Sequence, residues 1–575
     1  MKKFNLELTS LNHCSDDSET LMLGEWCDPK KKKSVTVNYH WDDRKKLYED
    51  FQYINSLYEK YLKYLTDSLN RIHQKDYSSE YWRIIIGPWL HYFISIFVDR
   101  YMMLRLASED FEIRQTRIPV YDHTDWIPLD YVDFNYKFYT DQWNYYLYSE
   151  ILRLSPLIPV RQTDFPLREY KAKDKKQSLI KSILFFLTKF TRIIPRHVTF
   201  IEIDMPQKYL YKLLLKLSSF SFSYYLRVQP KYFKPDWDLR ESIMEDMESR
   251  DDLERVLSEM IPSNMPIAYL EGYGNIEKDA ENIFPRKTKI MITSNAYFSN
   301  EHFKVWASKQ KLNGAKLWVM VHGGHHGTAL FNGPGKLTED IADRFYSWGW
   351  GDFNLPSPKL SVLKQRKLNQ ESNHILFIPY NISKYSNHLD SSPIASSFND
   401  CIEMHRNFFK LLDRHNLIEH LYVRLKSGFT LWDLKSEYEK ENINNFILSN
   451  DETIIESISK SGLVVVTYDS TVFLESLSLN SPTCLFIRKE YWEMSEQSSM
   501  HFKALNECGI LHYDEYSLMD HISNLNSDYI SWWNSSKVQR TIKSFLSEYG
   551  MSSLNWEHKW HEEIKIALKE YEDLT

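Results

Sequence analysis

The segment from residue 463 to 485 constrains the fold of this chain most, because a complete strand–helix–strand unit fits within it. An apolar run at 463–466 leads into a polar turn, an amphipathic segment follows, and a second apolar run occupies 483–487. This order predicts a buried strand, a short helix and a second buried strand. Two parallel strands joined by a helix in this way are typical of an α/β fold.

The polar turn of this segment predicts an anion site. Ser470 and Thr471 fall at the N-cap and first-turn positions of the predicted helix, directly after Asp469. The free backbone N–H groups and the helix dipole at such a position attract an anion, and the two hydroxyls add donors. Glu475, one turn further on, would reach a diol beyond that anion, so the pattern predicts a nucleotide. A capped helix that binds nothing is the alternative, because Ser and Thr cap many helices.

Length and composition favour a large, helix-rich α/β protein. The 575 residues are enough for roughly two to four domains. Hydrophobic residues make up 43% and aromatic residues 15%, while the chain has only 16 Gly and 20 Pro, which argues against a turn-rich all-β fold. The net charge of -7 is spread over 71 basic and 78 acidic residues, so the balance gives no indication of a nucleic-acid partner.

The sequence also predicts the compartment. Five cysteines without a CxxC pair indicate a reducing environment, without a disulfide framework or a cysteine zinc site. The N-terminus lacks the apolar segment of a signal peptide, and no window approaches the ~18 uncharged apolar residues of a membrane span. We therefore expect a cytoplasmic protein, either soluble or peripheral on the cytoplasmic face of the inner membrane. The basic run at 30–33 is a candidate lipid contact, with a solvated loop as the simpler interpretation.

The first part of the chain predicts one strand followed by long helices. A short apolar run at 20–23 leads to Glu25, which would then lie at the carboxyl end of a strand, where ligands bind in open α/β sheets. Glu25 is therefore a candidate acid or base, with a surface carboxylate as the alternative. Apolar residues at helical spacing predict long helices over 42–73 and 79–107.

A second polar loop follows a predicted strand at 315–321, which is preceded by a strand at 288–294 and a helix at 302–311. The loop reads His-Gly-Gly-His-His over residues 322–326. Its glycines let the backbone come close to a ligand, and its imidazoles titrate near neutral pH. We interpret the histidines as groups that bind phosphate or an acceptor hydroxyl, with a structural turn as the alternative. No metal is expected, because the spacing matches no metal motif.

A polar, Pro-containing stretch at 354–372 is the best candidate for a linker between two domains. Residues 1–353 would form an acceptor-side Rossmann-like domain with large helical insertions. Residues 373–520 would form a nucleotide-sugar-binding Rossmann-like domain, closed by helices over 521–575. Arg424 and Lys426 end a predicted strand of the second domain, so they would project toward the edge that holds Ser470 and neutralise a phosphate there.

Several motifs along the chain resemble those of a known family. They are LGEWCD (23–28), YHWDD (39–43), YWRIIIGPWL (81–90), DRY (99–101), HGGHHGT (322–328), ADRFYSWGWGD (342–352) and DSTVFLESLSLNSPT (469–483). Over nearly the whole chain they are similar to the Leptospira-type transferase family of bacterial O-antigen and surface-carbohydrate clusters. The C-terminal half is also similar, more loosely, to GT-B glycosyltransferases that use CMP-activated ulosonic acids (Kdo or nonulosonic acids).

This resemblance implies a GT-B-like α/β fold, in which two Rossmann-like domains face a cleft and the N-terminal domain carries a helix-rich elaboration. In the GT-B enzymes a Ser/Thr pair at a helix start binds the donor phosphate, a role that would fall on Ser470 and Thr471. The His-Pro dipeptide found in several of them is absent here, since Gly323 follows His322, and this departure bears on the CMP donor.

Together these patterns predict a glycosyltransferase of bacterial surface polysaccharide synthesis (O-antigen, lipopolysaccharide or capsule). It would transfer a sugar from a nucleotide donor, CMP favoured, to a glycan or lipid-linked acceptor, without a cofactor or a metal. The expected base is Glu25, His322, His325 or His326. The expected donor-binding residues are Gly323, Gly324, Arg424, Lys426, Asp469, Ser470, Thr471 and Glu475. The alternatives are a sugar-modifying transferase that moves another group, a GT-B-type epimerase, and a non-catalytic nucleotide-sugar-binding assembly protein.

Overall fold

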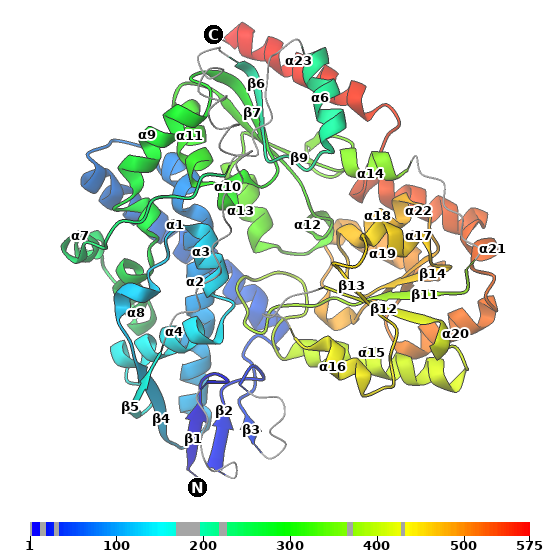
Figure 1. Ribbon diagram of the computed structural model, residues 1–575, viewed down its shortest axis with the longest axis horizontal. Coiled ribbons are helices and arrows are strands. Elements are labelled where there is room, and N and C mark those ends of the chain that lie inside the picture. The colour runs from blue at the N-terminus through cyan, green and yellow to red at the C-terminus, as the bar shows by residue number, and fades with distance from the viewer. Residues whose placement is uncertain are drawn as a thin grey trace.

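The computed structural model describes residues 3–11, 19–27, 34–167, 196–217, 227–245, 247–364, 372–426 and 432–574. Within these residues the chain forms three β-sheets, which lie at the lower left, the top and the right of Figure 1. We call them the N-terminal, middle and C-terminal sheets. Every strand pair in them is parallel, so the predicted α/β fold built from parallel Rossmann-like units is confirmed.

The N-terminal sheet has five strands in the order β3-β2-β1-β4-β5. They are β1 (Phe4–Glu7), β2 (Thr20–Met22), β3 (Val35–Thr36), β4 (Ile113–Val120) and β5 (Val160–Pro166). We expected one Rossmann-like unit before residue 353, whereas the structure holds this sheet in addition to the middle sheet. Only the strand near residue 20 was foreseen. β1 and β3 are too short for a period to be read from the sequence, and polar side chains interrupt the apolar pattern of β4 and β5.

Two long helices run beside the N-terminal sheet and pack along each other. α1 (Arg44–His73) begins at Asp43, whose carboxylate accepts from the backbone N–H groups of Lys45 and Lys46. α2 (Ser79–Asp110) buries side chains all round its surface, as a helix does when it lies in the middle of a protein. Both helices confirm their predictions. The shorter α3 (Tyr131–Lys137) and α4 (Asp141–Leu154) complete this region.

The middle sheet has the order β10-β9-β8-β7-β6. Its strands are β6 (Arg196–Ile201), β7 (Thr288–Thr293), β8 (Lys316–Met320), β9 (Arg344–Ser347) and β10 (Phe353–Asn354). The helices of this part of the chain are α6 (Gln207–Lys216), α7 (Trp237–Glu241), α8 (Asp252–Asn264), α9 (Tyr273–Ile283), α10 (Ala296–Ser299), α11 (Glu301–Leu312), α12 (His325–Thr328) and α13 (Gly333–Ile341). The predicted sequence of β7, α11 and β8 is confirmed.

The C-terminal sheet has the order β13-β12-β11-β14-β15-β16. Its strands are β11 (Ile375–Ile378), β12 (Leu421–Leu425), β13 (Phe446–Leu448), β14 (Leu463–Val466), β15 (Thr483–Phe486) and β16 (Leu511–His512). Its helices are α15 (Ser397–Arg414), α16 (Leu434–Glu439), α17 (Ile454–Ser459), α18 (Thr471–Ser478), α19 (Glu496–Glu507) and α20 (Glu515–Leu525).

In this sheet β14, α18 and β15 are the predicted strand–helix–strand unit, and all of β14 and β15 is buried. The strand order changes direction between β11 and β14, because the next strand in the chain after β11 lies on one side of it and β14 on the other. In open α/β sheets the crevice at such a switch point is where ligands bind.

The last helices connect the C-terminal sheet back to the middle sheet. α14 (Pro358–Leu363) occupies part of the expected linker, whose residues 365–371 lie outside the described residues. α21 (Tyr529–Trp533) and α22 (Ser536–Tyr549) follow the C-terminal sheet, and α22 packs on α18. α23 (Trp556–Leu574) then lies near α6 at the top of Figure 1, where Trp556 and Trp560 share a core with Val198 of β6.

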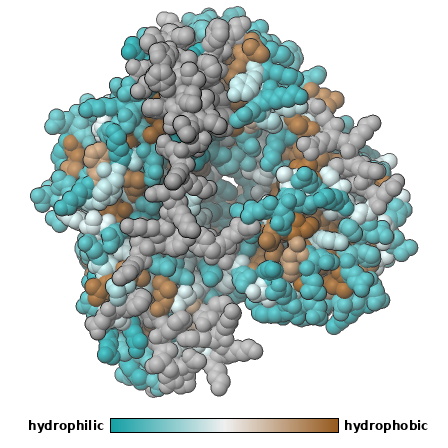
Figure 2. Space-filling model, in the orientation of Figure 1, coloured by the Kyte–Doolittle hydropathy of each residue, from teal (hydrophilic) through white to brown (hydrophobic). Residues whose placement is uncertain are grey.

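Figure 2 shows this face of the molecule as mainly hydrophilic, with a hollow near its middle. Among the described residues, no helix has both the length and the apolar character needed to cross a membrane.

Candidate functional site

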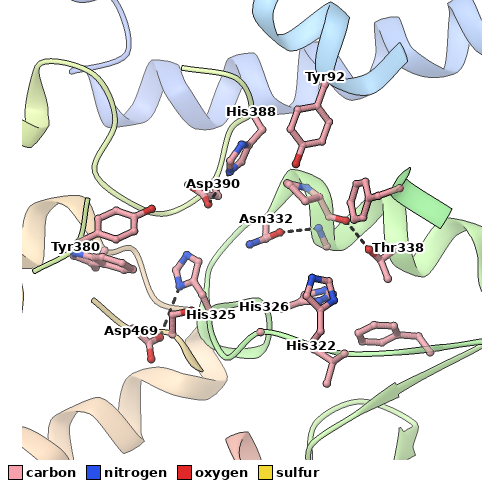
Figure 3. Close-up of a pocket in the computed structure, with 18 residues that line it drawn as sticks. Tyr92, His322, His325, His326, Asn332, Thr338, Tyr380, His388, Asp390 and Asp469 are labelled. Atoms are coloured by element: carbon pink, nitrogen blue, oxygen red, sulfur yellow. Dashed lines mark hydrogen bonds and ion pairs between the residues drawn. The ribbon is translucent and has the colours of Figure 1, made fainter. Parts of the chain in front are cut away.

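A cavity of about 290 Å³ lies between the carboxyl edges of the middle and C-terminal sheets (Figure 3). Tyr380 and Ser470, which follow β11 and β14, both line it, so the cavity coincides with the switch point of the C-terminal sheet. Tyr92 of α2 points into it from the opposite side. We call it the histidine cavity, because four histidines line it: His322, His325, His326 and His388.

The loop after β8 brings three of these histidines to the cavity, and two glycines shape it. A Cβ on Gly324 would lie 2.8 Å from Cδ1 of Leu474 and 3.0 Å from the backbone carbonyl carbon of Ser470. Only glycine therefore lets this loop lie against the start of α18. Gly323 lines the cavity, and a Cβ there would meet no atom within 4 Å. Gly324 thus allows close packing against α18, whereas Gly323 leaves open space in the cavity.

His325 is the histidine best placed for proton transfer. Its Nδ1 lies 3.7 Å from Oδ2 of Asp469, and neither ring nitrogen has a hydrogen-bond partner although both are buried. The Thr328 hydroxyl donates to the same Asp469 oxygen, which holds the carboxylate in place. Burial disfavours the imidazolium, but the negative charges of Asp469, Asp390 and Glu493 outweigh it and raise the pKa of His325. Asp469 and His325 thus form a carboxylate–imidazole pair within the cavity.

The two other histidines of the loop differ in their surroundings. Nε2 of His326 lies 2.9 Å from Oε1 of Glu339 on α13. Burial lowers the pKa of His322, because it disfavours the imidazolium, and the negative charge of Asp204 opposes this effect. At neutral pH His322 is therefore a neutral imidazole, which donates one hydrogen bond and accepts another.

Ser470 lies at the N-cap of α18, as predicted, and lines the cavity. Its side chain makes no capping hydrogen bond, which leaves the hydroxyl available to a molecule in the cavity. Thr471 begins the helix but does not line the cavity.

Glu475, one turn further on, is buried and paired with Lys359 of α14. Burial raises the pKa of Glu475, with Lys359 opposing the rise. The structure therefore gives Glu475 a partner within the protein instead of leaving it open to a ribose.

Three further predicted residues lie outside the histidine cavity. Arg424 donates to Oγ of Ser457 at 2.8 Å and to the backbone carbonyl of Glu452 at 2.7 Å, so α17 and the segment before it occupy its guanidinium. Lys426 is exposed and lines a neighbouring cavity. Glu25 lines neither cavity; burial and the charge of Asp42 raise its pKa. Strand ends of one sheet share an edge, but side chains that leave them need not converge.

Sequence reasoning missed a second carboxylate–imidazole pair. Nε2 of His388 lies 3.3 Å from Oδ2 of Asp390, and Asn387 contacts the other ring nitrogen. Burial opposes ionisation of Asp390, but hydrogen bonds from His388 and Ser392 together with nearby histidine charge hold the pKa of Asp390 well below its usual range. Their position in the sequence could have predicted this pair. Both residues follow β11, and the segments after strands at a switch point line the ligand crevice.

The other missed residues come from remote parts of the chain. Tyr92, Asn332 and Trp492 line the cavity from α2, from the residue before α13 and from the loop after β15, respectively. No local pattern marks them, because their place depends on how whole elements pack.

Two groups of described residues are arranged closely enough to hold a metal ion, and both lie away from this cavity. They are Cys484, His512 and His521, and His558, His561 and Glu562.

Comparison with known proteins identifies one family. The model of the LIC12162 family transferases matches residues 4–564, nearly the whole chain. No curated protein matches the sequence. Among solved structures, the wall teichoic acid polymerase TagF is 11% identical with a TM-score of 0.32, covering 68% of this chain and 93% of its own. Acinetobacter baumannii MurG is 9% identical with a TM-score of 0.33, covering 65% and 100%. A UDP-N-acetylglucosamine 2-epimerase is 13% identical with a TM-score of 0.35, covering 65% and 96%.

Proposed function

Because this chain belongs to the LIC12162 family of transferases, we propose that it is a glycosyltransferase that uses a nucleotide sugar as its donor. The observation that carries the proposal is the uncommitted Ser470 hydroxyl at the start of α18, inside a cavity that four histidines share at the switch point of the C-terminal sheet. The setting we propose is bacterial surface polysaccharide synthesis, with a glycan or lipid-linked acceptor at the cytoplasmic face of the inner membrane.

The donor phosphate would lie at the start of α18. There the first backbone N–H groups of the helix and the Ser470 hydroxyl donate hydrogen bonds, and the positive end of the helix dipole favours an anion. Neutral His322 lines the same cavity and would offer a further donor there. Glu475 has no part in this proposal, because Lys359 pairs with it.

The charge of the cavity supports a donor with one phosphate group over one with two. Among the described residues, neither lysine nor arginine lines the histidine cavity. A diphosphate carries more charge than a phosphodiester and needs cations or a metal to neutralise it. We therefore propose a CMP-linked sugar as the donor class, without a metal or another cofactor. The choice of Kdo or a nonulosonic acid as the sugar comes from the family resemblance and not from the charge of the cavity, because these sugars carry a carboxylate of their own.

His325 is the base that we propose among the four predicted candidates. It lines the cavity, has unpartnered ring nitrogens and has Asp469 beside it to stabilise the imidazolium. In the reaction the acceptor hydroxyl gives its proton to His325, and its oxygen forms a bond to the anomeric carbon. The bond from that carbon to the phosphate oxygen breaks, and the nucleotide leaves with the electron pair. Ser470 and the α18 N–H groups stabilise the charge that develops on the phosphate.

Calorimetric titration of the full-length protein with CMP, UDP and GDP tests the proposal. We expect CMP to bind most tightly of the three, and we expect the protein to release CMP when it is incubated with CMP-linked sugars and a glycan acceptor. A protein that binds none of them would contradict the donor site. Release of nucleotide without formation of a new glycosidic bond would favour an epimerase or another sugar-modifying enzyme.

A further inference from the structure

A second cavity of about 390 Å³ adjoins the histidine cavity. Three residues line both of them, namely Tyr380, His388 and Asp390, so the two cavities share one wall. Most of the second cavity is formed by the segment between β11 and α15, residues 380–395. Lys426, at the end of β12, and Tyr139, between α3 and α4, complete it. We call it the tyrosine cavity.

The segment that forms the tyrosine cavity is fixed to the N-terminal part of the chain by polar contacts. Arg100 of α2 donates to the backbone carbonyl of Ser386 at 2.8 Å, and Tyr39 donates to the hydroxyl of the same serine at 2.9 Å. Tyr385 donates to Asp141 at 2.5 Å. Ser386 and Tyr385 are both buried, and their partners Arg100 and Asp141 lie on different helices, α2 and α4. The cavity is therefore built where the C-terminal unit meets the N-terminal one.

The chemistry of the tyrosine cavity differs from that of its neighbour. Tyr139, Tyr380 and Tyr385 line it together with serine and asparagine residues. Tyr385 is buried, whereas Tyr139 and Tyr380 are partly exposed. Oδ1 of Asn381 is buried and has no hydrogen-bond partner, so a bound hydroxyl would satisfy it. Among the described lining residues the only lysine or arginine is Lys426, which is exposed. Aromatic faces with uncharged polar groups suit a neutral sugar, which stacks on a ring and shares hydrogen bonds through its hydroxyls.

We propose that the tyrosine cavity is the acceptor site and that it takes a neutral saccharide. This places the acceptor mainly on residues 380–395, and not on residues 1–353 as the sequence had predicted. This inference rests on the proposed donor site in the histidine cavity. The acceptor sugar would lie along Tyr139 and Tyr380, with one hydroxyl directed past the shared wall, toward His325 and the anomeric carbon of the donor. His388 and Asp390, which line both cavities, would orient that hydroxyl. Each substrate thus enters a separate cavity, and they meet where the two cavities join.

A pair of cavity-filling substitutions tests the assignment. Ile382→Trp adds a large ring to a partly buried position of the tyrosine cavity. Gly323→Val, its matched control, fills the histidine cavity at a position where a Cβ meets no atom within 4 Å. The probes are methyl α-mannoside, methyl β-galactoside and methyl N-acetyl-β-glucosaminide, observed by saturation-transfer NMR with the full-length protein, and CMP, UDP and GDP, observed by calorimetry.

We expect at least one methyl glycoside to give saturation transfer that saturating nucleotide does not displace. Ile382→Trp should weaken that glycoside at least 10-fold and change nucleotide affinity less than 2-fold, while Gly323→Val should do the reverse. Asn381→Ala provides a second, smaller change in the tyrosine cavity, with an expected loss of about 3- to 10-fold in glycoside affinity. Unchanged thermal unfolding of each variant shows that it is folded.

Three outcomes overturn the acceptor assignment. They are the absence of saturation transfer from all three glycosides, retention of the glycoside signal in both Ile382→Trp and Asn381→Ala, and loss of nucleotide binding in Ile382→Trp. The last outcome would place the nucleoside in the tyrosine cavity and leave the nucleotide-sugar donor itself intact. Failure of the unaltered protein to bind any nucleotide is a separate result, which contradicts the proposed function and not the saccharide site.

Discussion

Two loops of this protein follow a buried strand of a parallel sheet and carry glycine next to candidate acid–base residues, yet among their described residues only the loop after β8 lines the histidine cavity. In the loop after β2 the ring of Trp26 covers Gly24, where a Cβ would lie 2.4 Å from the ring, and the indole donates to the carbonyl of Leu8 at 3.1 Å. In the loop after β8 a Cβ on Gly323 would meet nothing within 4 Å, and the ring nitrogens of His325 have no partner.

The difference shows that a position at the carboxyl edge of a parallel sheet is not sufficient to make a ligand site. In the described part of the loop after β2, residues 23–27, the buried Trp26 ring fills the space beside Gly24. The loop after β8 relies on a second unit, because Gly324 packs against the start of α18 and the space between the two units remains. A site arises where two edges meet and neither fills the gap.

The largest effect that would test this comparison is expected for His325→Ala. Removal of the general base should lower kcat by about 10²–10⁴-fold, because proton transfer from the acceptor hydroxyl loses its partner. Nucleotide affinity, measured by calorimetry, should change little. A variant that keeps more than a tenth of the kcat of the unaltered protein would remove His325 from the role of base.

Ser470→Ala combined with Thr471→Ala should weaken nucleotide binding by about 1–3 kcal/mol, since hydrogen bonds to a charged phosphate are lost. The single variants sharpen the prediction. Ser470→Ala should carry most of the loss because only Ser470 lines the cavity, and Thr471→Ala serves as its neighbour control. Calorimetry with the nucleotide that binds best measures all three. Unchanged affinity in the double variant would contradict a phosphate at the start of α18.

The two glycines make a matched pair for stability. Gly24→Ala should lower the free energy of unfolding by about 1–3 kcal/mol, because the new methyl group displaces the buried Trp26 ring. Gly323→Ala should change it by less than about 0.5 kcal/mol, as expected for a substitution into open space. Chemical denaturation followed by tryptophan fluorescence gives both values. Equal losses would mean that the loop after β8 is as tightly packed as the loop after β2.

The pH dependence of kcat should report the Asp469–His325 pair. As a base His325 must be unprotonated, and its pKa is raised above the ordinary value of 6.5, so activity should fall as the pH drops through that raised pKa. Asp469→Asn removes the neighbouring negative charge, lowers the pKa of His325 and should move the acidic limb to lower pH by roughly one unit. A limb that stays in place would show that another group controls it.

The smallest effect is expected for Glu25→Gln. Glu25 lines neither the histidine cavity nor the tyrosine cavity, so kcat and nucleotide affinity should both remain within about twofold of the unaltered protein. Nucleotide release under saturating donor provides the measurement. A loss of more than tenfold would restore Glu25 as a candidate base and would mean that the loop after β2 takes part in the reaction.

Local patterns along the chain predict both polar loops and the elements that position them. Residues 463–485 form their strand, helix and strand because apolar runs, a polar turn and helical spacing are local patterns within a few residues. The same holds for β8 and the histidine loop after it, and for Ser470 at the N-cap. The N-terminal sheet was not foreseen as a separate sheet, because polar side chains interrupt the apolar pattern of its two longest strands, β4 and β5.

Only the tertiary structure decided which side chains share a cavity. His388 and Asp390 join His325 across the switch point, and Tyr92 reaches them from a helix far away in the chain. The same packing pairs Glu475 with Lys359 and lets Arg424 donate to the backbone carbonyl of Glu452, before α17. From their sequence positions both residues had been predicted to bind the nucleotide. Local sequence fixes the direction of a strand or a helix start, but the partner of a side chain depends on distant elements that are brought together by burial of their apolar faces.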